Sequence, residues 1–458
     1  MTFNKKVIYV LIVMLILFCG LVCYFSYFQI FISPSLANAG ANPRTYVKEQ
    51  TVKRGSFYDR NGECLAYSEM KDGVQTRVYP FNRLYSQLIG YSHPRFGRTL
   101  LENTQNAHLL GSSEQNILDA LLYSDDTDGD TVHLTVDNTL QQLAADLLGN
   151  RKGAIVAMEP SSGQILAMVS KPWFNPNNLA DDWDKLTKED GMFVPRATNG
   201  LYPPGSVFKI ITAAAAVENM MDNETFEDTG KFNVGGYDIV NYDNHVYGTL
   251  DIDTAFAKSS NTYFAYLADK LGKDKLQRTA ESFGFNKEIT LEIPVSKSTL
   301  LKSDSRTNVA SVGYGQGDTL TTPLHMAMVT SAIANDGVMM QPYLVSKITD
   351  KDGTILKENS SSTFMRSTSP VVAQRITEMM KACVTRGTGT GAHLSGITVA
   401  AKTGTAEVGG DKGDHAWFVA FAPAENPKIA LSIVMENAGT TGSACAGMAA
   451  RLIQSYLK

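Results

Sequence analysis

Residues 153–170 read GAIVAMEPSSGQILAMVS, with two apolar runs on either side of a short polar turn. The runs, 153–158 and 164–170, are typical of buried strands, and the Pro/Ser/Gly turn between them is typical of a hairpin. Two more strand-like runs, 417–422 and 429–435, lie near the end of the chain and are separated by PAENP. We therefore predict that strands from both ends of this region form one buried sheet.

The stretches between these strands have apolar residues at helical spacing. The predicted helices are 135–149, which lies just before the first strand, and then 206–219, 251–271, 323–335 and 370–383. Strands at both ends of a helix-rich middle favour one central sheet with helices on its faces. The predicted fold class is therefore α/β in the broad sense, or α+β.

Length and composition set limits on what the chain is. A chain of 458 residues exceeds a usual single domain, so we expect two or three folding units. The formal net charge is −5, and no lysine- or arginine-rich run occurs. Nucleic acid is therefore not a predicted partner.

The N-terminal segment 7–31, VIYVLIVMLILFCGLVCYFSYFQIF, contains no charged residue. A helix of this length reaches about 37 Å, enough to span a hydrocarbon core of about 30 Å. Lys5 and Lys6 precede it, whereas the next basic residue is Arg44. This asymmetry predicts a single-pass anchor with residues 1–6 in the cytoplasm and the rest of the chain outside the cell membrane.

A cleaved signal peptide is the alternative for this segment, because it has the same order of charges. Residues 35–39, SLANA, resemble a cleavage site. However, the apolar run is longer than the roughly 7–15 residues of a signal peptide, and it ends in bulky aromatic residues. We therefore expect an uncleaved anchor, followed by a linker rich in small residues and proline at 33–44.

The cysteines and histidines indicate no metal site. Cys19 and Cys23 lie in the apolar segment, which leaves Cys64, Cys383 and Cys445 in the rest of the chain. Their spacing argues against a zinc site and against a disulfide framework, although one disulfide remains possible. The histidines show no HExxH or paired spacing, and the glycine-rich stretches do not open a helix in a βαβ unit. We predict neither a metal nor a cofactor.

The first chemical motif is PPGSVFKI at 203–210. Proline and glycine form a turn before a good helix former, so Ser206 lies at a helix start with Lys209 three positions later. Residues at i and i+3 share a helix face, which places the lysine amine within reach of the serine hydroxyl. A lysine whose pKa is lowered by burial or by another cation is able to act as a base toward such a serine.

The second motif is KSSN at 258–261, within the predicted helix 251–271. Consecutive small polar residues gain little in a structural helix, because they compete for their own backbone. In a catalytic interpretation both ends of the triplet act on the substrate. Ser259 would relay a proton to a leaving amine, and Asn261 would hold a substrate amide.

The third motif is AKTGTA at 401–406, which fits a strand. Gly404 would let another backbone approach closely. A substrate laid antiparallel to this strand would gain main-chain hydrogen bonds. Lys402 and the hydroxyls of Thr403 and Thr405 would then face an anionic carboxylate.

Each motif alone is weak, because serine is a common helix cap and lysine on a helix is usually solvated. Their occurrence together and in order is a recognised set for class A β-lactamases and penicillin-binding proteins. In that arrangement the backbone N–H groups of Ser206 and Thr405 would form an oxyanion hole.

Longer stretches carry a wider resemblance. They are GAIVAMEPSSGQILAMVSKPWFNPN (153–177), PRATNGLYPPGSVFKIITAAAA (195–216), GYGQGDTLTTPLHMAMVTSAIANDGVMMQPYLV (313–345), KTGTAE (402–407) and HAWFVAFAP (415–423). All of them resemble the transpeptidase domain of class B penicillin-binding proteins. RGSFYDRNG at 54–62 resembles the start of that family's N-terminal pedestal.

The resemblance implies a domain plan: a cytoplasmic tail at 1–6, a transmembrane helix at 7–31, a linker and small mixed pedestal (dimerisation-like) domain at 32–150, and a transpeptidase domain at 151–458. The transpeptidase domain would have a central, mainly antiparallel sheet flanked by helices. The segment before residue 150 is too short for a glycosyltransferase domain, which argues against a bifunctional class A enzyme.

The implied activity is D,D-transpeptidation of peptidoglycan. Ser206 would attack stem peptides ending in D-Ala-D-Ala, with Lys209, Ser259, Asn261 and Lys402 as the other catalytic residues. Thr403, Gly404 and Thr405 would bind substrate. β-Lactams would acylate the same serine, and a polytopic glycan polymerase is an implied membrane partner.

Two alternatives remain open from the sequence. One is a hydrolase with the same motifs, either a D,D-carboxypeptidase or a β-lactamase. Class A β-lactamases use a Glu-x-x-x-Asn element, which is absent between Ser259 and Lys402. The other is a non-catalytic cell-wall scaffold or β-lactam sensor. The predicted cytoplasmic tail argues against a sensor, because it is too short for a signalling module.

Overall fold

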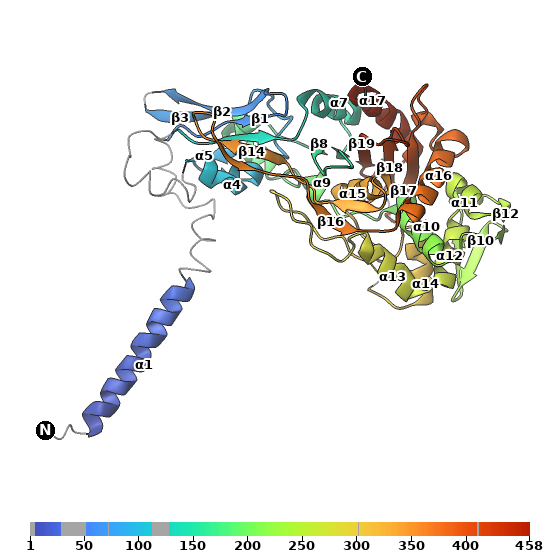
Figure 1. The fold of residues 1–458 in the computed structure, drawn as a ribbon, viewed down its shortest axis with the longest axis horizontal. Coiled ribbons are helices and arrows are strands. Elements are labelled where there is room, and N and C mark those ends of the chain that lie inside the picture. Colours follow the sequence, from blue (N-terminus) through green and yellow to red (C-terminus); the bar gives the residue numbers. More distant parts are fainter. Residues whose placement is uncertain (1–4, 29–51, 72, 112–127, 301, 410–411) are drawn as a thin grey trace.

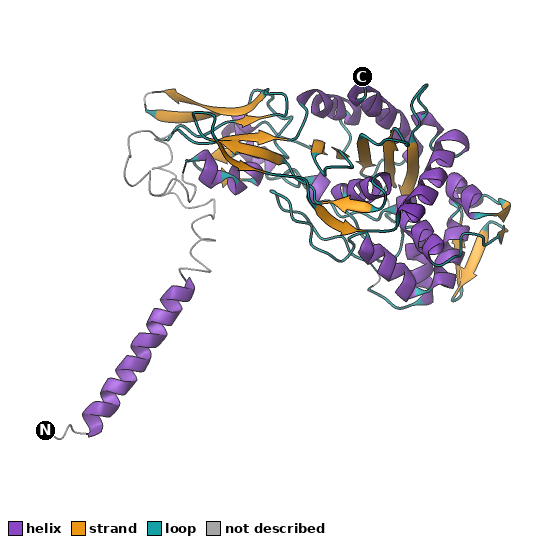
Figure 2. Cartoon of the chain, viewed as in Figure 1, coloured by secondary structure: helices purple, strands orange, loops and turns teal. Residues whose placement is uncertain are grey.

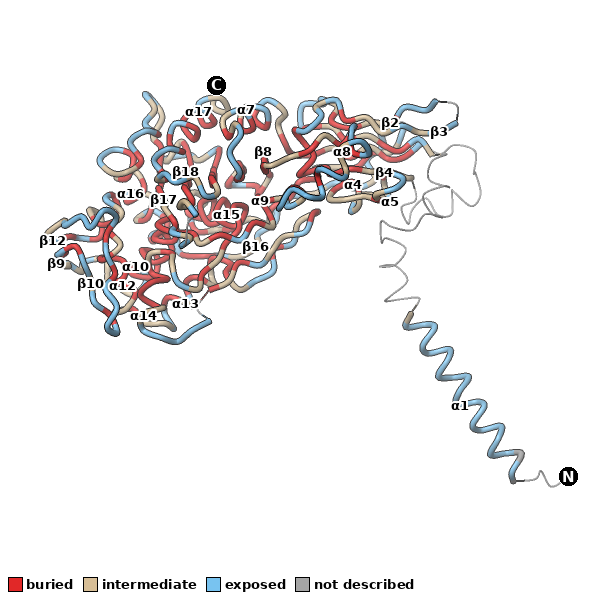
Figure 3. Tube along the Cα trace, turned by 180° about the vertical axis from the view of Figure 1, so that it is seen from behind, coloured by how far each residue is buried: buried red, intermediate tan, exposed pale blue. Residues whose placement is uncertain are grey.

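The computed structural model describes residues 5–28, 52–71, 73–111, 128–300, 302–409 and 412–458 (Figure 1). Helix α1 (Lys5–Tyr27) carries a 20-residue apolar stretch of mean hydropathy 2.8. Within the described residues it is the one helix long and apolar enough to cross a membrane, and Figure 3 shows it exposed along its length. The end of the predicted anchor, 29–31, and the predicted linker lie outside the described residues.

A five-stranded antiparallel sheet forms the centre of the part of the chain that follows residue 150 (Figure 2). In spatial order its strands are β17 (Ala400–Ala406), β18 (His415–Ala422), β19 (Ile429–Met435), β7 (Gly153–Met158) and β8 (Ile165–Lys171). The late strands β18 and β19 pair with the early hairpin β7–β8, because β19 lies beside β7. The predicted sheet is therefore confirmed, with strands from both ends of the region.

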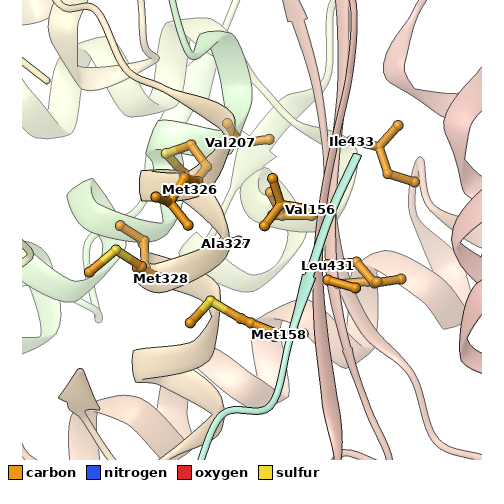
Figure 4. Close-up of a cluster of buried hydrophobic side chains, with 14 of the residues drawn as sticks. Val156, Met158, Val207, Met326, Ala327, Met328, Leu431 and Ile433 are labelled. Atoms are coloured by element: carbon orange, nitrogen blue, oxygen red, sulfur yellow. The ribbon is translucent and has the colours of Figure 1, made fainter. Parts of the chain in front are cut away.

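Helices cover both faces of this sheet. Helix α15 (Pro323–Ala334) packs against β19, β7 and β18. Figure 4 shows Val156 and Met158 on the side of the sheet that faces α15, and Leu431 and Ile433 on the opposite side. Helices α7 (Asn138–Leu148) and α17 (Ala446–Tyr456) pack on each other and on the sheet. The helix predicted from 135 starts at Asn138, because the side chain of Asp137 caps it by accepting from the N–H of Leu140 at 2.9 Å.

A second group of helices packs beside β17. They are α10 (Lys209–Glu218), α11 (Ile252–Lys258), α12 (Asn261–Leu271), α13 (Lys273–Ser282), α14 (Arg306–Gly313) and α16 (Pro370–Arg386). Helix α16 packs on β17 and on α10 and α11. The prediction of one helix over 251–271 is wrong, because the chain leaves the helix at Ser259 and starts a new one at Asn261.

A six-stranded mixed sheet forms the N-terminal lobe. In spatial order its strands are β15 (Ile355–Glu358), β14 (Val345–Thr349), β6 (Thr131–Leu134), β1 (Phe57–Tyr58), β2 (Cys64–Lys71) and β3 (Val74–Val78). Strands β14 and β15 come from far beyond residue 150, the boundary predicted for the pedestal. The backbone of β6 is satisfied on one side by β1 and on the other by β14, so the later segment completes this sheet.

The remaining helices and strands are short. The helical ones are α4 (Leu100–Thr104), α5 (Asn106–Leu109), α8 (Leu179–Leu186), α9 (Arg196–Asn199), η2 (Pro176–Asn178), η3 (Gly205–Phe208), η4 (Tyr242–Asn244), η5 (Thr390–Ala392) and η6 (Gly442–Cys445). The strands are β4 (Ser92–His93), β5 (Gly97–Arg98), β9 (Phe226–Asp228), β10 (Lys231–Val234), β11 (Tyr237–Val240), β12 (Gly248–Leu250), β13 (Val338–Met340) and β16 (Thr363–Arg366).

A buried ion-pair network joins the parts of the N-terminal lobe. The carboxylate of Glu102, on α4, is fully buried and accepts from Arg54 Nε and Arg77 Nε at 2.7 Å each. The hydroxyl of Tyr79 also donates to it, at 3.1 Å. The two arginines lower the pKa of Glu102, while burial opposes them by raising it.

The substitution Glu102→Ala tests this network. It leaves two arginine guanidinium groups buried without their anion, which costs about 3 kcal/mol of folding free energy. We expect a clear fall in the melting temperature, measured by thermal unfolding. As a control, Glu288→Ala removes an exposed carboxylate 3.1 Å from Lys297, and we expect a change of less than about 1 kcal/mol. Equal melting temperatures for the two variants would contradict the role of the buried network.

Candidate active site

Ser206 lies on the 3₁₀ turn η3 that leads into α10. Gly205 before it has φ +54°, and its N–H donates to the carbonyl of Gly315 at 2.9 Å. A Cβ at Gly205 would lie 2.4 Å from the carbonyl oxygen of Thr405. Glycine is therefore required here both for backbone conformation and for the close approach of the turn to β17. The Ser206 side chain lines a cleft and makes no hydrogen bond to any residue that the structure describes.

Lys209, one helical turn further on, is completely buried. Its ammonium donates to the carbonyl of Ser259 at 2.6 Å and to Asn261 Oδ1 at 2.8 Å, and it lies 3.3 Å from Ser259 Oγ. The sequence predicted that this amine reaches the Ser206 hydroxyl. In the structure it is bonded to the second motif instead.

The second motif is a sharp turn between two helices. Ser259 ends α11 in the left-handed region, with φ 63° and ψ 37°, and Ser260 then caps α12 by accepting from the N–H of Tyr263 at 3.1 Å. Ser and Asn favour such a break, because their side chains bond nearby backbone groups in place of helical partners. The turn directs the carbonyl and the hydroxyl of Ser259 toward the same lysine.

The third motif lies on β17, as predicted, in the hairpin with β18. Lys402 is completely buried, and its ammonium donates to Ser259 Oγ at 2.8 Å and to the carbonyl of Thr403 at 3.0 Å. At Gly404 a Cβ would lie 3.0 Å from Val207 Cγ1 and 2.9 Å from Trp417 Cβ. The strand therefore packs tightly against the turn that carries Ser206, as expected for a glycine at this position.

Comparison with known proteins agrees with this geometry. The chain matches the penicillin-binding protein transpeptidase domain over residues 153–454 and the penicillin-binding protein A dimerisation domain over residues 54–132. The chain belongs to the penicillin-binding transpeptidase family. The family resemblance predicted from the sequence and the predicted fold class are thereby confirmed.

Individual relatives are similar to this chain over most of its length. It is 34% identical to the peptidoglycan D,D-transpeptidase PbpA of Mycolicibacterium smegmatis, over 92% of this chain and 91% of the relative. A penicillin G acyl-enzyme complex of penicillin-binding protein A from M. tuberculosis matches with TM-score 0.84 and 32% identity, over 89% of this chain and all of that one. A D,D-transpeptidase domain from Eggerthella lenta matches with TM-score 0.82 and 36% identity, over 89% and 98% of the two chains.

The pKa values of the two buried lysines, Lys209 and Lys402, are both lowered. Burial lowers the pKa of Lys209 well below its usual value, and the charge of Lys402 lowers it further. Burial lowers the pKa of Lys402 to about 8. No carboxylate of the described residues lies within 4.0 Å of either ammonium, so nothing counteracts the cost of burial by ion pairing.

The motifs line one cleft of about 260 Å³. Of the predicted residues, Ser206, Ser259, Asn261, Thr403 and Thr405 line it, and the ammonium groups of Lys209 and Lys402 lie beneath. The residues that the sequence analysis missed include a wall from the segment after β11, which contributes Tyr242, Asp243, His245 and Tyr247. They also include Thr388, whose hydroxyl lies 2.5 Å from that of Thr403, and the cleft-lining Tyr314, Gln316, Glu407, Asp414, Thr441 and Ser443. The glycine pair at 235–236 was a turn signal for the hairpin that leads into this wall.

Gly205→Ala tests the close approach of η3 to β17. The added Cβ would overlap the Thr405 carbonyl, so we expect a loss of about 3 kcal/mol from backbone strain and overpacking together. The control is Gly236→Ala, where φ is +83° but a Cβ meets nothing within 4 Å, so that strain alone costs about 1 kcal/mol. Melting temperatures measure both, and equal losses would contradict the steric argument.

Proposed function

We propose that this chain is a membrane-anchored D,D-transpeptidase that cross-links peptidoglycan stem peptides through an acyl-enzyme on Ser206. One observation carries the proposal: two buried lysine ammonium groups meet on the hydroxyl of Ser259, beneath a cleft that opens on Ser206. Relatives named as peptidoglycan D,D-transpeptidases, and a relative captured as a penicillin G acyl-enzyme, support the same activity.

In the first half of the reaction, Lys209 acts as the base. Its low pKa gives a neutral amine that accepts the proton of Ser206 as Oγ attacks the carbonyl of the penultimate D-alanine. The lysine has a flexible four-carbon stem, so a side-chain rotation moves Nζ from the Ser259 carbonyl to the hydroxyl one helical turn away. The backbone N–H groups of Ser206 and Thr405 stabilise the oxyanion.

Collapse of the tetrahedral intermediate breaks the C–N bond and leaves an ester on Ser206. The proton taken up by Lys209 passes through Ser259, which is bonded to both lysines, to the departing amine of the terminal D-alanine. An amine from a second stem peptide then attacks the ester and frees Ser206, which forms the cross-link. A β-lactam acylates the same serine, but its leaving group stays attached.

Three residues of β17 bind substrate in this mechanism. Thr403 and Thr405 line the cleft, and their hydroxyls hold the substrate carboxylate above the positive charge of Lys402. Gly404 keeps the strand close to Ser206. Asn261 holds the substrate amide, since it lies at the cleft and already bonds Lys209.

We further propose that α1 anchors the chain with its N-terminus in the cytoplasm and the cleft outside. Lys5 and Lys6 before the apolar stretch support this orientation. A polytopic glycan polymerase is the proposed membrane partner, by family resemblance. Residues 32–150 and 151–458 remain the proposed pedestal and transpeptidase domains. Strands β14 and β15 belong by sequence to the transpeptidase domain but pair with the sheet of the pedestal.

Covalent labelling with a fluorescent penicillin tests the function. We expect the purified protein to retain label in a denaturing gel for many minutes, and Ser206→Ala to retain none. Ser161→Ala, at an exposed serine on the β7–β8 turn, should label like the wild type. An unlabelled wild type or a labelled Ser206→Ala variant would refute the proposal, and label lost within seconds would indicate a hydrolase.

The pH dependence of acylation tests the two lysines. The rate should rise with pH as Lys209 loses its proton, and fall above about pH 8 as Lys402 loses its charge. In Lys402→Met the second positive charge is gone, so the pKa of Lys209 rises and the ascending limb moves to higher pH. The exposed Lys428→Met is the matched control, with no expected shift. An unmoved ascending limb in Lys402→Met would contradict coupling between the two amines.

A further inference from the structure

Asn241 lies behind the cleft, directly after β11, and is only 2% exposed. Its side-chain oxygen accepts from the backbone N–H groups of Asn261 at 2.8 Å and Thr262 at 3.2 Å. Its side-chain nitrogen donates to Asp228 Oδ2 at 2.7 Å and to the carbonyl of His245 at 2.9 Å. This one amide therefore joins the start of α12 to the segment that forms a wall of the cleft.

The contact to α12 satisfies donors that the helix cannot satisfy itself. The first N–H groups of a helix have no partner within it, and Ser260 caps only the N–H of Tyr263. Asn241 accepts from the two N–H groups before that one, Asn261 and Thr262. The backbone position of Asn261 is therefore set by a side chain from outside the helix.

Asp228 holds the Asn241 amide in this orientation. Its carboxylate is fully buried, and its other oxygen accepts from the N–H of Gly230 at 2.8 Å. No lysine, arginine or histidine among the described residues lies within ion-pair distance of it. The carboxylate of Asp228 is therefore stabilised by the N–H of Gly230 and the side-chain nitrogen of Asn241. Its negative charge polarises the Asn241 amide, so that the amide oxygen becomes a better acceptor.

Asn241 also contacts the cleft wall, through the carbonyl of His245. The turn from Asn241 to His245 is closed by the bond to the His245 carbonyl, and Tyr242, Asp243 and His245 from this turn line the cleft. Asn261 lines the same cleft and accepts from the Lys209 ammonium at 2.8 Å. Asn241 thus fixes the position of the cleft wall relative to Asn261, whose side chain bonds Lys209.

We propose that Asn241 is a positioning residue of the transpeptidase: through the bond to its backbone it places Asn261 against Lys209, and it fixes the wall segment 242–247 relative to both. The inference rests on the proposed function, because it assigns a role to Asn241 through the site residues proposed above. Without this amide the Asn261 N–H lacks a partner, the first turn of α12 shifts, and the Asn261 side chain moves away from Lys209, which keeps its bond to the Ser259 carbonyl.

The experiment measures acylation of the full-length protein by a fluorescent penicillin over a range of concentrations, which separates the limiting rate from the half-saturating concentration. In Asn241→Ala we expect the limiting rate to fall about 10- to 100-fold, as for a displaced reacting group, with a smaller change in half-saturation. The control is Asn233→Ala, in the same hairpin, which removes a 2.6 Å bond from its amide to Asp238 on the surface. It should acylate at the wild-type rate.

Two further variants separate positioning from a general loss of structure. If Asn241 acts through Asn261, the double variant Asn241→Ala/Asn261→Ala is no slower than Asn261→Ala alone. The exchange Asp228→Asn with Asn241→Asp keeps the charge, reverses the donor between the two side chains and retains an oxygen facing Asn261. Because it removes the donor to the His245 carbonyl, it tests the contact to α12 apart from the contact to the wall. We expect it to fold and to recover most of the acylation rate that Asn241→Ala loses.

The outcomes are distinct from those of the proposed function. A wild-type protein that takes no label refutes the function itself. A labelled wild type with Asn241→Ala at the same limiting rate overturns only this inference. So do additive losses in the double variant, or an exchange variant that folds with an unchanged melting temperature but acylates as slowly as Asn241→Ala.

Discussion

The active site depends on two lysine ammonium groups buried side by side without a carboxylate in ion-pair distance among the described residues. Burying an unpaired charge is costly, and proteins usually respond by lowering the pKa of the amine. Here the partners of Lys209 and Lys402 are neutral oxygens: the hydroxyl and carbonyl of Ser259, the amide of Asn261 and the carbonyl of Thr403. Such oxygens hold an ammonium in place but stabilise its charge less than an anion would. The same arrangement therefore fixes both amines and leaves Lys209 able to be neutral.

This constraint explains why the fold brings three distant segments together with such small separations. Ser206 and Lys209 share one turn and helix, Ser259 lies between two helices, and Lys402 lies on the edge strand of the sheet. Water must be excluded from the amines, so the segments have to pack without gaps. Gly205 and Gly404 make this possible, because any Cβ there would meet the facing chain. The sheet and α16 then hold β17 against the turn, so the chemistry depends on packing that involves the whole domain.

Much of this arrangement could be predicted from the sequence, and the errors have physical causes. The two hairpins were visible because apolar runs alternate with turn residues, and their pairing followed from burial. The break at Ser259 was missed, because apolar residues on both sides of it continue the helical pattern and hide one left-handed residue. The addition of β14 and β15 to the N-terminal sheet was missed, because strand pairing over such a distance leaves no local signal. Asn241 was missed for the same reason, since a lone asparagine after a short strand has many equivalents in any chain.

The conformation of Ser259 shows how stability and chemistry conflict in this site. A left-handed serine costs about 1 kcal/mol or more relative to an ordinary conformation, and glycine would remove that strain. Glycine would also remove the hydroxyl, which among the described residues is the one group bonded to both amines. The ammonium groups of Lys209 and Lys402 would then lack the hydroxyl that lies between them. The proton would also lose its proposed route to the leaving group. A helical serine would avoid strain as well, but its carbonyl would be used by the helix and could not bond Lys209. The strained residue is therefore the arrangement that satisfies both lysines, and the caps on the first turn of the helix that follows it, from Ser260 and Asn241, supply the bonds that hold this break in place.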